Sequence, residues 1–227
     1  MLPFTSTHFG NPSSSHCYGK LSKTAIITAR KSVAKLINSE SDSCIVFTGC
    51  GTESDNRAID IAIHHYYTRS KSNNTALPLT LPRIVTSAIE HPGILKYLQY
   101  LVEGIPGREM QPRIDLVILP VNKEGFVELD VLKGALTPTT VLVTIMHSNN
   151  EVGTIQPIKK ISIIIKQYNM DNNVDILLHS DAAQSFGKVM VDVQYLGVDM
   201  CTIVGHKFGA PKGIAALYIR QAHRRVR

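Results

Sequence analysis

The sequence of 227 residues contains no tryptophan and only four cysteines, which lie far apart and form no CxxC pair. Paired cysteines are typical of structural metal sites, and dense cysteine frameworks are typical of small secreted domains. We therefore expect no metal site, no disulfide framework and a reduced protein of the cytosol.

Long apolar runs and strong charge clusters are also missing. No apolar run approaches the length needed to span a membrane, and no charged segment followed by an apolar stretch predicts a signal peptide. The net charge of +6 is spread along the chain. Only the tail at 223–227 concentrates it, which is more typical of a solvated terminus than of a nucleic-acid surface. We expect neither a membrane nor a nucleic acid as a partner.

The chain does contain enough apolar residues, 44% of the total, to bury one sizeable core. Short apolar runs alternate with longer amphipathic ones, which predicts an α/β fold with a mostly parallel central sheet flanked by helices. We expect strands at 44–49, 83–88, 115–121, 139–147, 174–184, 198–205 and 213–220. We expect helices at 20–38, 53–67, 93–104, 128–136 and 157–169. The segments 70–82 and 104–112 are expected to be loops.

The segment TGCGTESDN, residues 48–56, joins an expected strand to an expected helix. Its small residues allow close backbone approach, and the free N–H groups at a helix start favour an anion. The segment is neither a Walker A loop nor a GxGxxG motif. An ordinary strand–turn–helix connection with a threonine cap explains the same residues.

Four further polar segments follow expected strands: AIEHPG with His91, MHSNNEVG with Asn150, HSDAAQS with Asp181 and Gln184, and TIVGHKFGAPKG with Lys207. Each has a plain structural explanation, such as a helix-capping aspartate or a solvated lysine. The carboxyl ends of parallel strands meet at one edge of a sheet, however, so one small-molecule site can gather all five segments.

The combined set of groups suits pyridoxal phosphate. A lysine can bind the aldehyde of this cofactor, and an aspartate can pair with its ring nitrogen. The helix start in TGCGTESDN can take the phosphate.

The motifs GTESDN, EH, SNNEVG, DAAQSFGK and VGHKFGAPKG occur in this order along the chain. Together they resemble the class V, fold type I pyridoxal-phosphate enzymes of the cysteine desulfurase and selenocysteine lyase group. The resemblance extends from Gly10 to Arg220. It implies that residues 1–227 form the large cofactor-binding domain.

The resemblance implies a role for each matching residue. Lys207 corresponds to the lysine that binds the cofactor and moves protons, and His91 to the imidazole stacked on its ring. Asp181 corresponds to the partner of the ring nitrogen. Gln184 and Asn150 correspond to groups near the phenolic oxygen. The phosphate contacts correspond to Gly51, Thr52 and His206. Lys207 and His91 are the catalytic candidates.

Two departures from the family pattern limit what the resemblance implies. Val204 stands where many desulfurases carry a serine, so one phosphate hydrogen bond is absent or replaced. Family members also continue into a smaller C-terminal domain, missing here, that carries the sulfur- or selenium-accepting cysteine and a substrate-binding arginine. None of the four cysteines matches that cysteine by motif, so each is expected to be a core or surface thiol.

The motif TIVGHKF and its neighbours resemble selenocysteine lyases more than bacterial cysteine desulfurases. We therefore expect a selenocysteine lyase that converts L-selenocysteine to L-alanine. The alternatives are a cysteine desulfurase acting on L-cysteine and a non-catalytic cofactor-binding fragment, while a class V aminotransferase is disfavoured by the lysine motif. By resemblance, the full-length protein is expected to be a homodimer.

Overall fold

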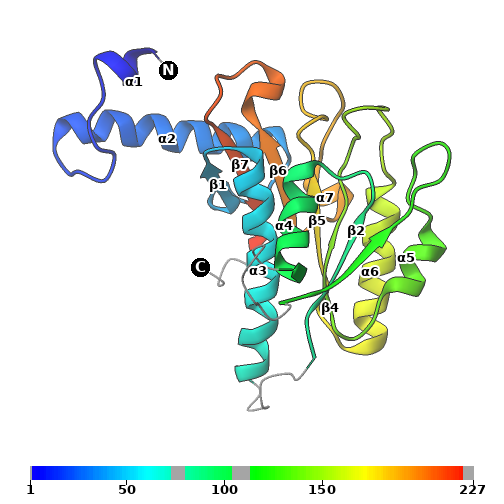
Figure 1. Cartoon of the computed structure of the whole chain (residues 1–227). Coiled ribbons are helices and arrows are strands. Elements are labelled where there is room, and N and C mark those ends of the chain that lie inside the picture. Colours follow the sequence, from blue (N-terminus) through cyan, green and yellow to red (C-terminus); the bar gives the residue numbers. More distant parts are fainter. Residues whose placement is uncertain (1, 73–79, 104–112, 222–227) are drawn as a thin grey trace.

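A seven-stranded sheet forms the centre of the computed structural model, which describes residues 2–72, 80–103 and 113–221 (Figure 1). The strands are β1 (Ile45–Thr48), β2 (Arg83–Ser87), β3 (Asp115–Leu119), β4 (Thr140–Thr144), β5 (Leu177–Asp181), β6 (Met200–Val204) and β7 (Ala215–Ile219). Their order across the sheet is β1-β7-β6-β5-β4-β2-β3. The pairs from β6 to β3 are parallel, whereas β7 runs antiparallel to both β1 and β6. The prediction of a mostly parallel sheet flanked by helices is confirmed.

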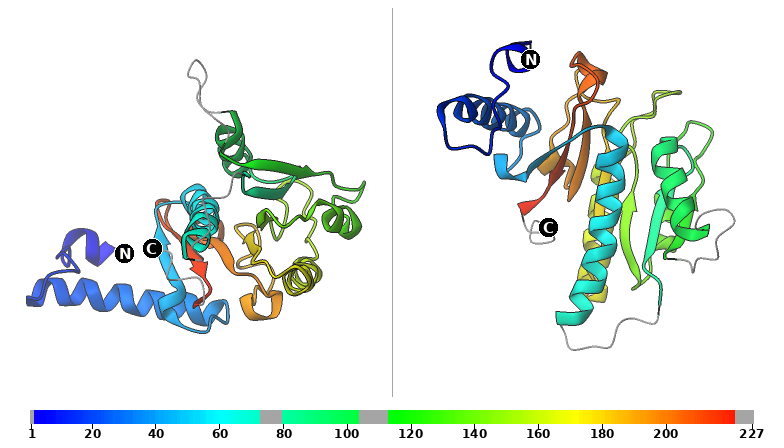
Figure 2. Two further views of the ribbon diagram at one scale, coloured as in Figure 1. Left: turned by 90° about the horizontal axis from the view of Figure 1, so that it is seen from below. Right: turned by 60° about the vertical axis from the view of Figure 1, so that its left-hand side comes forward.

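Helices cover both faces of this sheet (Figure 2). They are α1 (Leu2–Ser6), α2 (Cys17–Leu36), α3 (Gly51–Ser72), α4 (Pro92–Glu103), α5 (Leu129–Ala135), α6 (Ile158–Asn172) and α7 (Val193–Leu196), with short 3-10 turns η1 (Asp42–Cys44) and η2 (Gly205–Phe208). The helices α3 and α4 pack on one face, and α5, α6 and α7 pack on the other. No helix among the described residues is long and apolar enough to cross a membrane.

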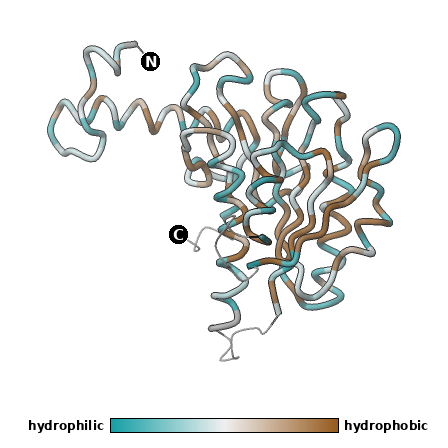
Figure 3. Tube along the Cα trace, in the orientation of Figure 1, coloured by the Kyte–Doolittle hydropathy of each residue, from teal (hydrophilic) through white to brown (hydrophobic). Residues whose placement is uncertain are grey.

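The strand sequences explain why both faces are covered. In β5, Leu177 belongs to the core beneath α3 and α4, whereas Leu178 belongs to the core beneath α6. Successive side chains of a strand point to opposite faces, so a strand that is apolar at every position needs a helix layer on each side. Figure 3 shows the hydrophobic residues gathered along these central strands.

Several element boundaries differ from those expected. The strand expected at 174–184 is confined to Leu177–Asp181, because the Asn169 side chain bonds both backbone groups of Ile176 and the chain turns after Asp181. The helix expected at 53–67 is longer and runs from Gly51 to Ser72, so the first residues of the expected loop at 70–82 are helical. Residues 73–79 of that loop, and the expected loop at 104–112, lie outside the described residues.

Candidate active site

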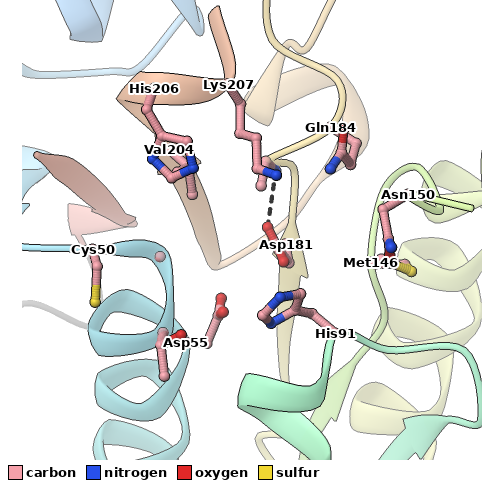
Figure 4. Close-up of a pocket in the computed structure, with 13 residues that line it drawn as sticks. Cys50, Asp55, His91, Met146, Asn150, Asp181, Gln184, Val204, His206 and Lys207 are labelled. Carbon is pink, nitrogen blue, oxygen red and sulfur yellow. Dashed lines mark hydrogen bonds between the residues drawn. The ribbon is translucent and has the colours of Figure 1, made fainter. Parts of the chain in front are cut away.

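A cavity of about 170 Å³ lies where β1, β2, β4, β5 and β6 end (Figure 4). The eight residues that the sequence selected all line it: Gly51, Thr52, His91, Asn150, Asp181, Gln184, His206 and Lys207. The parallel strands place these segments at one edge of the sheet although up to 156 residues separate them in sequence. Cys50, Asp55, Met146, Ala183 and Val204 complete the lining.

The start of α3 forms one wall of the cavity. A Cβ atom added to Gly51 would lie 2.6 Å from Val204 Cγ2, so glycine lets the helix start approach the end of β6. Glu53 Oε2 accepts a hydrogen bond from the Gly49 N–H at 2.7 Å, which fixes the turn before the helix. The first-turn N–H groups of a helix have no partner within that helix and attract anions. This wall therefore suits a phosphate group, with the Thr52 hydroxyl beside it.

Asp181 ends β5 and is only 6% exposed. Its Oδ1 accepts a hydrogen bond from the Ala183 N–H at 2.8 Å. Burial raises the pKa of the Asp181 carboxyl, while the Ala183 N–H and the charges of His91 and Lys207 act in the opposite direction. A buried carboxylate with basic neighbours can hold a cationic ring nitrogen.

Lys207 follows β6 in the 3-10 turn η2 and is exposed. Figure 4 shows its amine pointing toward the Asp181 carboxyl. The turn begins at Gly205, where an added Cβ would lie 3.0 Å from the Ile214 side chain and carbonyl. Because the amine extends into the cavity from an exposed turn, a bound molecule can reach it directly.

His91 lies between β2 and α4, with its imidazole exposed at the cavity. Its Nδ1 accepts a hydrogen bond from the Gly93 N–H at 3.0 Å. An Nδ1 that accepts carries no proton, so a neutral His91 ring carries its proton on Nε2. The bond also holds the ring at the start of α4. Figure 4 shows the ring beside Asp181.

The two neighbouring asparagines after β4 differ in what they contact. Asn149 is buried, donates to the Ile89 carbonyl and accepts from the N–H groups of Glu151 and Val152. Asn150 is exposed and lines the cavity. The first asparagine therefore holds the turn, and the second has its amide available to a ligand.

Gln184 lies in the turn after β5 and lines the same side of the cavity as Asn150 (Figure 4). Its Oε1 accepts a hydrogen bond from Lys188 Nζ at 2.9 Å. This bond leaves the amide nitrogen of Gln184 as the donor for an oxygen within the cavity.

The family described as "Aminotransferase class-V" matches residues 1–226 of the chain. The chain belongs to the class V aminotransferase family.

This class V chain is 42% identical to the cysteine desulfurase IscS of Dictyoglomus turgidum over 221 residues, which cover 97% of the chain and 50% of the relative. Among solved structures, it resembles a NifS-like protein (TM-score 0.82, 34% identity, 97% of this chain and 54% of that one). It also resembles SspA in complex with cysteine (TM-score 0.79, 34% identity, 97% and 56%). The chain spans about half the length of the relatives it matches. Their names favour cysteine desulfurase, our alternative, over selenocysteine lyase.

The class V cavity fits pyridoxal phosphate by its own chemistry. It combines a helix start for an anion, a buried carboxyl for a ring nitrogen, an exposed amine for an aldehyde and two amides for oxygen atoms. Gly51 carries no side chain and lines the cavity at the start of α3, so it contributes only backbone atoms to the anion subsite. Val204 adds no hydroxyl there, as expected from its side chain.

Sequence reasoning assigned no role to two further residues of this class V cavity. Cys50, expected to be a core or surface thiol, is exposed and lines the cavity at the start of α3, where its Sγ accepts from the Glu53 N–H at 3.4 Å. Asp55 is buried and follows Gly51 by one helical turn, so the helical period places both on one face. This helical spacing is the feature of the sequence from which the position of Asp55 at the cavity could have been predicted. Among the described residues, no cluster of three His, Cys, Asp or Glu side chains could hold a metal ion.

Proposed function

We propose that residues 1–227 are the large cofactor-binding domain of a pyridoxal-phosphate-dependent cysteine desulfurase. The observation that carries this proposal is the convergence of eight side chains and backbone positions from five strand ends on one cavity. The class V membership and the relatives named cysteine desulfurases support the same reaction class.

Binding follows from the residues of the cavity. The N–H groups at the start of α3, the Thr52 hydroxyl and His206 would hold the phosphate, and Asp181 would pair with the ring nitrogen. His91 would lie against the ring. Gln184 and Asn150 would donate their amide N–H groups to oxygen atoms of the cofactor or substrate.

When bound, pyridoxal phosphate supplies an electron-withdrawing ring that stabilises negative charge at the substrate α-carbon. Lys207 and His91 are two basic groups at the cavity that could move a proton to and from that carbon. Asp181 would favour a proton on the ring nitrogen, because a buried carboxylate stabilises a positive partner. The chain thus supplies the acid–base groups and the electrostatic support for the reaction.

L-Cysteine is the substrate that we propose, with L-selenocysteine as its selenium analogue. The relative SspA was solved with cysteine, which supports an amino-acid substrate of this size. By resemblance, a smaller C-terminal domain supplies the accepting thiol and the arginine for the substrate carboxylate. On the same resemblance, we propose that the full-length protein is a homodimer located in the cytosol.

A second candidate is a fragment that binds the cofactor without turning over a substrate. No arginine is among the residues that line the cavity in the described part of the chain. A substrate carboxylate there lacks the bidentate partner that guanidinium groups provide. This observation favours binding without turnover for the 227 residues taken alone.

Absorption spectroscopy tests cofactor binding. Adding pyridoxal phosphate to the purified chain should produce a visible absorption band that Lys207→Ala abolishes. Lys212→Ala is the matched control, since this lysine is exposed, follows the same turn and does not line the cavity. A chain without such a band, or a band that survives Lys207→Ala unchanged, would contradict the assignment.

Turnover tests the reaction class and the second candidate. The loaded chain is incubated with L-cysteine or L-selenocysteine, and L-alanine is measured. Alanine from L-cysteine supports the desulfurase. Alanine from L-selenocysteine alone supports the lyase, and cofactor binding without alanine supports the fragment.

A further inference from the structure

The Asp55 carboxyl forms part of the cavity wall beneath the proposed phosphate subsite. Asp55 lies one turn after Gly51 on α3 and is only 2% exposed. Among the described residues, its Oδ1 makes no hydrogen bond, and the nearest group that could carry positive charge, His179 Nε2, lies 3.8 Å away. A buried carboxylate without a close cation or donor at one oxygen is unstable, whereas a neutral carboxylic acid is tolerated.

His179 does not neutralise Asp55. Its Nδ1 lies 2.8 Å from Thr144 Oγ1 and its Nε2 lies 3.0 Å from Thr202 Oγ1, so both ring nitrogens have hydroxyl partners. The ring is completely buried, and this burial lowers the pKa of His179 to about 3. The imidazole is therefore neutral at physiological pH and leaves Asp55 without a positive neighbour.

Asp181 is the second acid of this buried region. Burial and the charge of Asp181 together raise the pKa of Asp55 well above its ordinary value, and the Thr202 hydroxyl only partly opposes this. Further titratable groups lie near the pair in β5, the β2–α4 segment, the turn before α3 and η2: His179, Glu90, His91, Cys50 and Lys207. Both carboxyls are buried and line the same cavity, so two negative charges there are costly.

The surroundings decide which acid ionises. Asp181 accepts a hydrogen bond from the Ala183 N–H, and the Lys207 amine points toward its carboxyl (Figure 4). Among the described residues, Asp55 Oδ1 accepts no hydrogen bond, and the basic group nearest to it is the neutral His179 at 3.8 Å. The single negative charge of the pair therefore belongs on Asp181, and the proton belongs on Asp55.

We propose that Asp55 is a positioning residue that keeps the proton of the Asp55–Asp181 pair, so that Asp181 alone presents a negative charge to the cofactor ring. A protonated Asp55 also carries no negative charge that would repel a phosphate bound at the start of α3. This assignment rests on the proposed function for its role, but the location of the proton is a property of the chain itself.

Infrared spectroscopy locates the proton without cofactor, since protonated carboxyl groups and carboxylates absorb at separate frequencies. Near neutral pH, the difference spectrum between the unmodified chain and Asp55→Asn should show the loss of a protonated carboxyl band. Asp181→Asn should instead lose carboxylate absorption. The opposite pattern in the two variants would overturn the proposal.

Glu90→Gln provides a second measurement in case Asp55→Asn does not fold. Glu90 is also buried, and burial raises its pKa to about 8, so it contributes a protonated band of its own. In Glu90→Gln a protonated carboxyl band should remain at neutral pH, because Asp55 still carries its proton. Complete loss of the band in this variant would overturn the proposal.

Cofactor affinity tests the consequence of the proton. Asp55→Asn replaces a neutral acid with a neutral amide, whereas Asp181→Asn removes a negative charge, so Asp55→Asn should weaken pyridoxal phosphate binding less than Asp181→Asn does. A loss of affinity in folded Asp55→Asn as large as that in Asp181→Asn would overturn the proposal. If the unmodified chain itself does not bind the cofactor, the proposed function fails, and the infrared comparison still decides where the proton lies.

Discussion

The exposed basic rim of the cavity (His91, His206 and Lys207) and the buried acid layer beneath it (Asp55, Glu90 and Asp181) differ in both charge and solvent access. The rim residues lie in turns after strands, and their exposed side chains contribute little to packing in the core. The acid layer is enclosed by the sheet, α3 and α4, so its charge state depends on a few hydrogen bonds. Binding groups can therefore be exchanged at the rim with small effects on folding, whereas changes in the acid layer alter both stability and charge.

The largest expected effect comes from Asp181→Asn. The variant keeps an acceptor for the Ala183 N–H but loses the charge that faces Lys207 and His91. Breaking a buried charge pair costs about 3–5 kcal/mol, which corresponds to a loss of roughly 10²–10⁴-fold in pyridoxal phosphate affinity. Titration of the absorption band measures this loss. An affinity of Asp181→Asn within threefold of that of the unmodified chain would contradict the pairing of Asp181 with the ring nitrogen.

Glu90→Gln should change how stability depends on pH. Glu90 Oε1 accepts hydrogen bonds from Ser87 Oγ and the Met146 N–H, and burial raises its pKa from 4.5 to about 8. The folded state then holds a proton that the unfolded state releases. The resulting stability is complete below pH 4.5 and decreases as pH rises to about 8.

The expected slope from Glu90 is at most about 1.4 kcal/mol per pH unit in this interval. Urea denaturation of the unmodified chain and of Glu90→Gln between pH 5 and 8 measures it. The variant should lose stability less steeply as pH rises. Equal slopes in both proteins would show that Glu90 is ionised in the folded state.

Gly51→Ala tests the wall between the rim and the acid layer. The new Cβ would lie 2.6 Å from Val204 Cγ2, so α3 and β6 must separate. Overpacking of this kind costs about 1–3 kcal/mol and should also weaken cofactor binding. Gly134→Ala in α5 is the control, because an added Cβ there meets no atom within 4 Å.

The control variant Gly134→Ala should be more stable than the unmodified chain by about 0.5–1 kcal/mol, because alanine has a higher helix propensity than glycine. Thermal and urea denaturation of the two variants give the comparison directly. A Gly51→Ala protein as stable as Gly134→Ala would mean that the start of α3 is not closely packed.

The smallest effect on folding is expected for His206→Ala at the rim. His206 is exposed, so the free energy of unfolding should change by no more than about 0.5 kcal/mol. Cofactor affinity should still fall by roughly 10- to 100-fold, since a hydrogen bond to a charged phosphate contributes about 1.5–3 kcal/mol. Denaturation and absorption titration together separate the two effects. A large loss of stability would contradict the division between rim and acid layer.

Much of the fold and the rim could be predicted from sequence because both follow from local patterns. Alternating apolar runs predict a parallel sheet, and polar residues after each strand then meet at one edge. Lys207 and Asp181 were found in this way. The reversed direction of β7 was not predicted, since an apolar strand reads alike in either direction.

The acid layer was only partly predicted, because burial of a carboxyl depends on distant segments. Asp55 and Glu90 look like ordinary surface residues of a helix and a turn. Their burial arises from packing of α3 and α4 on the sheet, and their pKa values depend on neighbours more than 30 residues away. The different contacts of Asn149 and Asn150 also required the folded turn.

The most direct test of the account is to identify the lysine that binds pyridoxal phosphate. The chain is mixed with the cofactor, the lysine–cofactor bond is reduced with borohydride, and the labelled peptide is identified by mass spectrometry. The account predicts label on Lys207, at the cavity beside Asp181. Label distributed over surface lysines, with Lys207 unmodified, would contradict it.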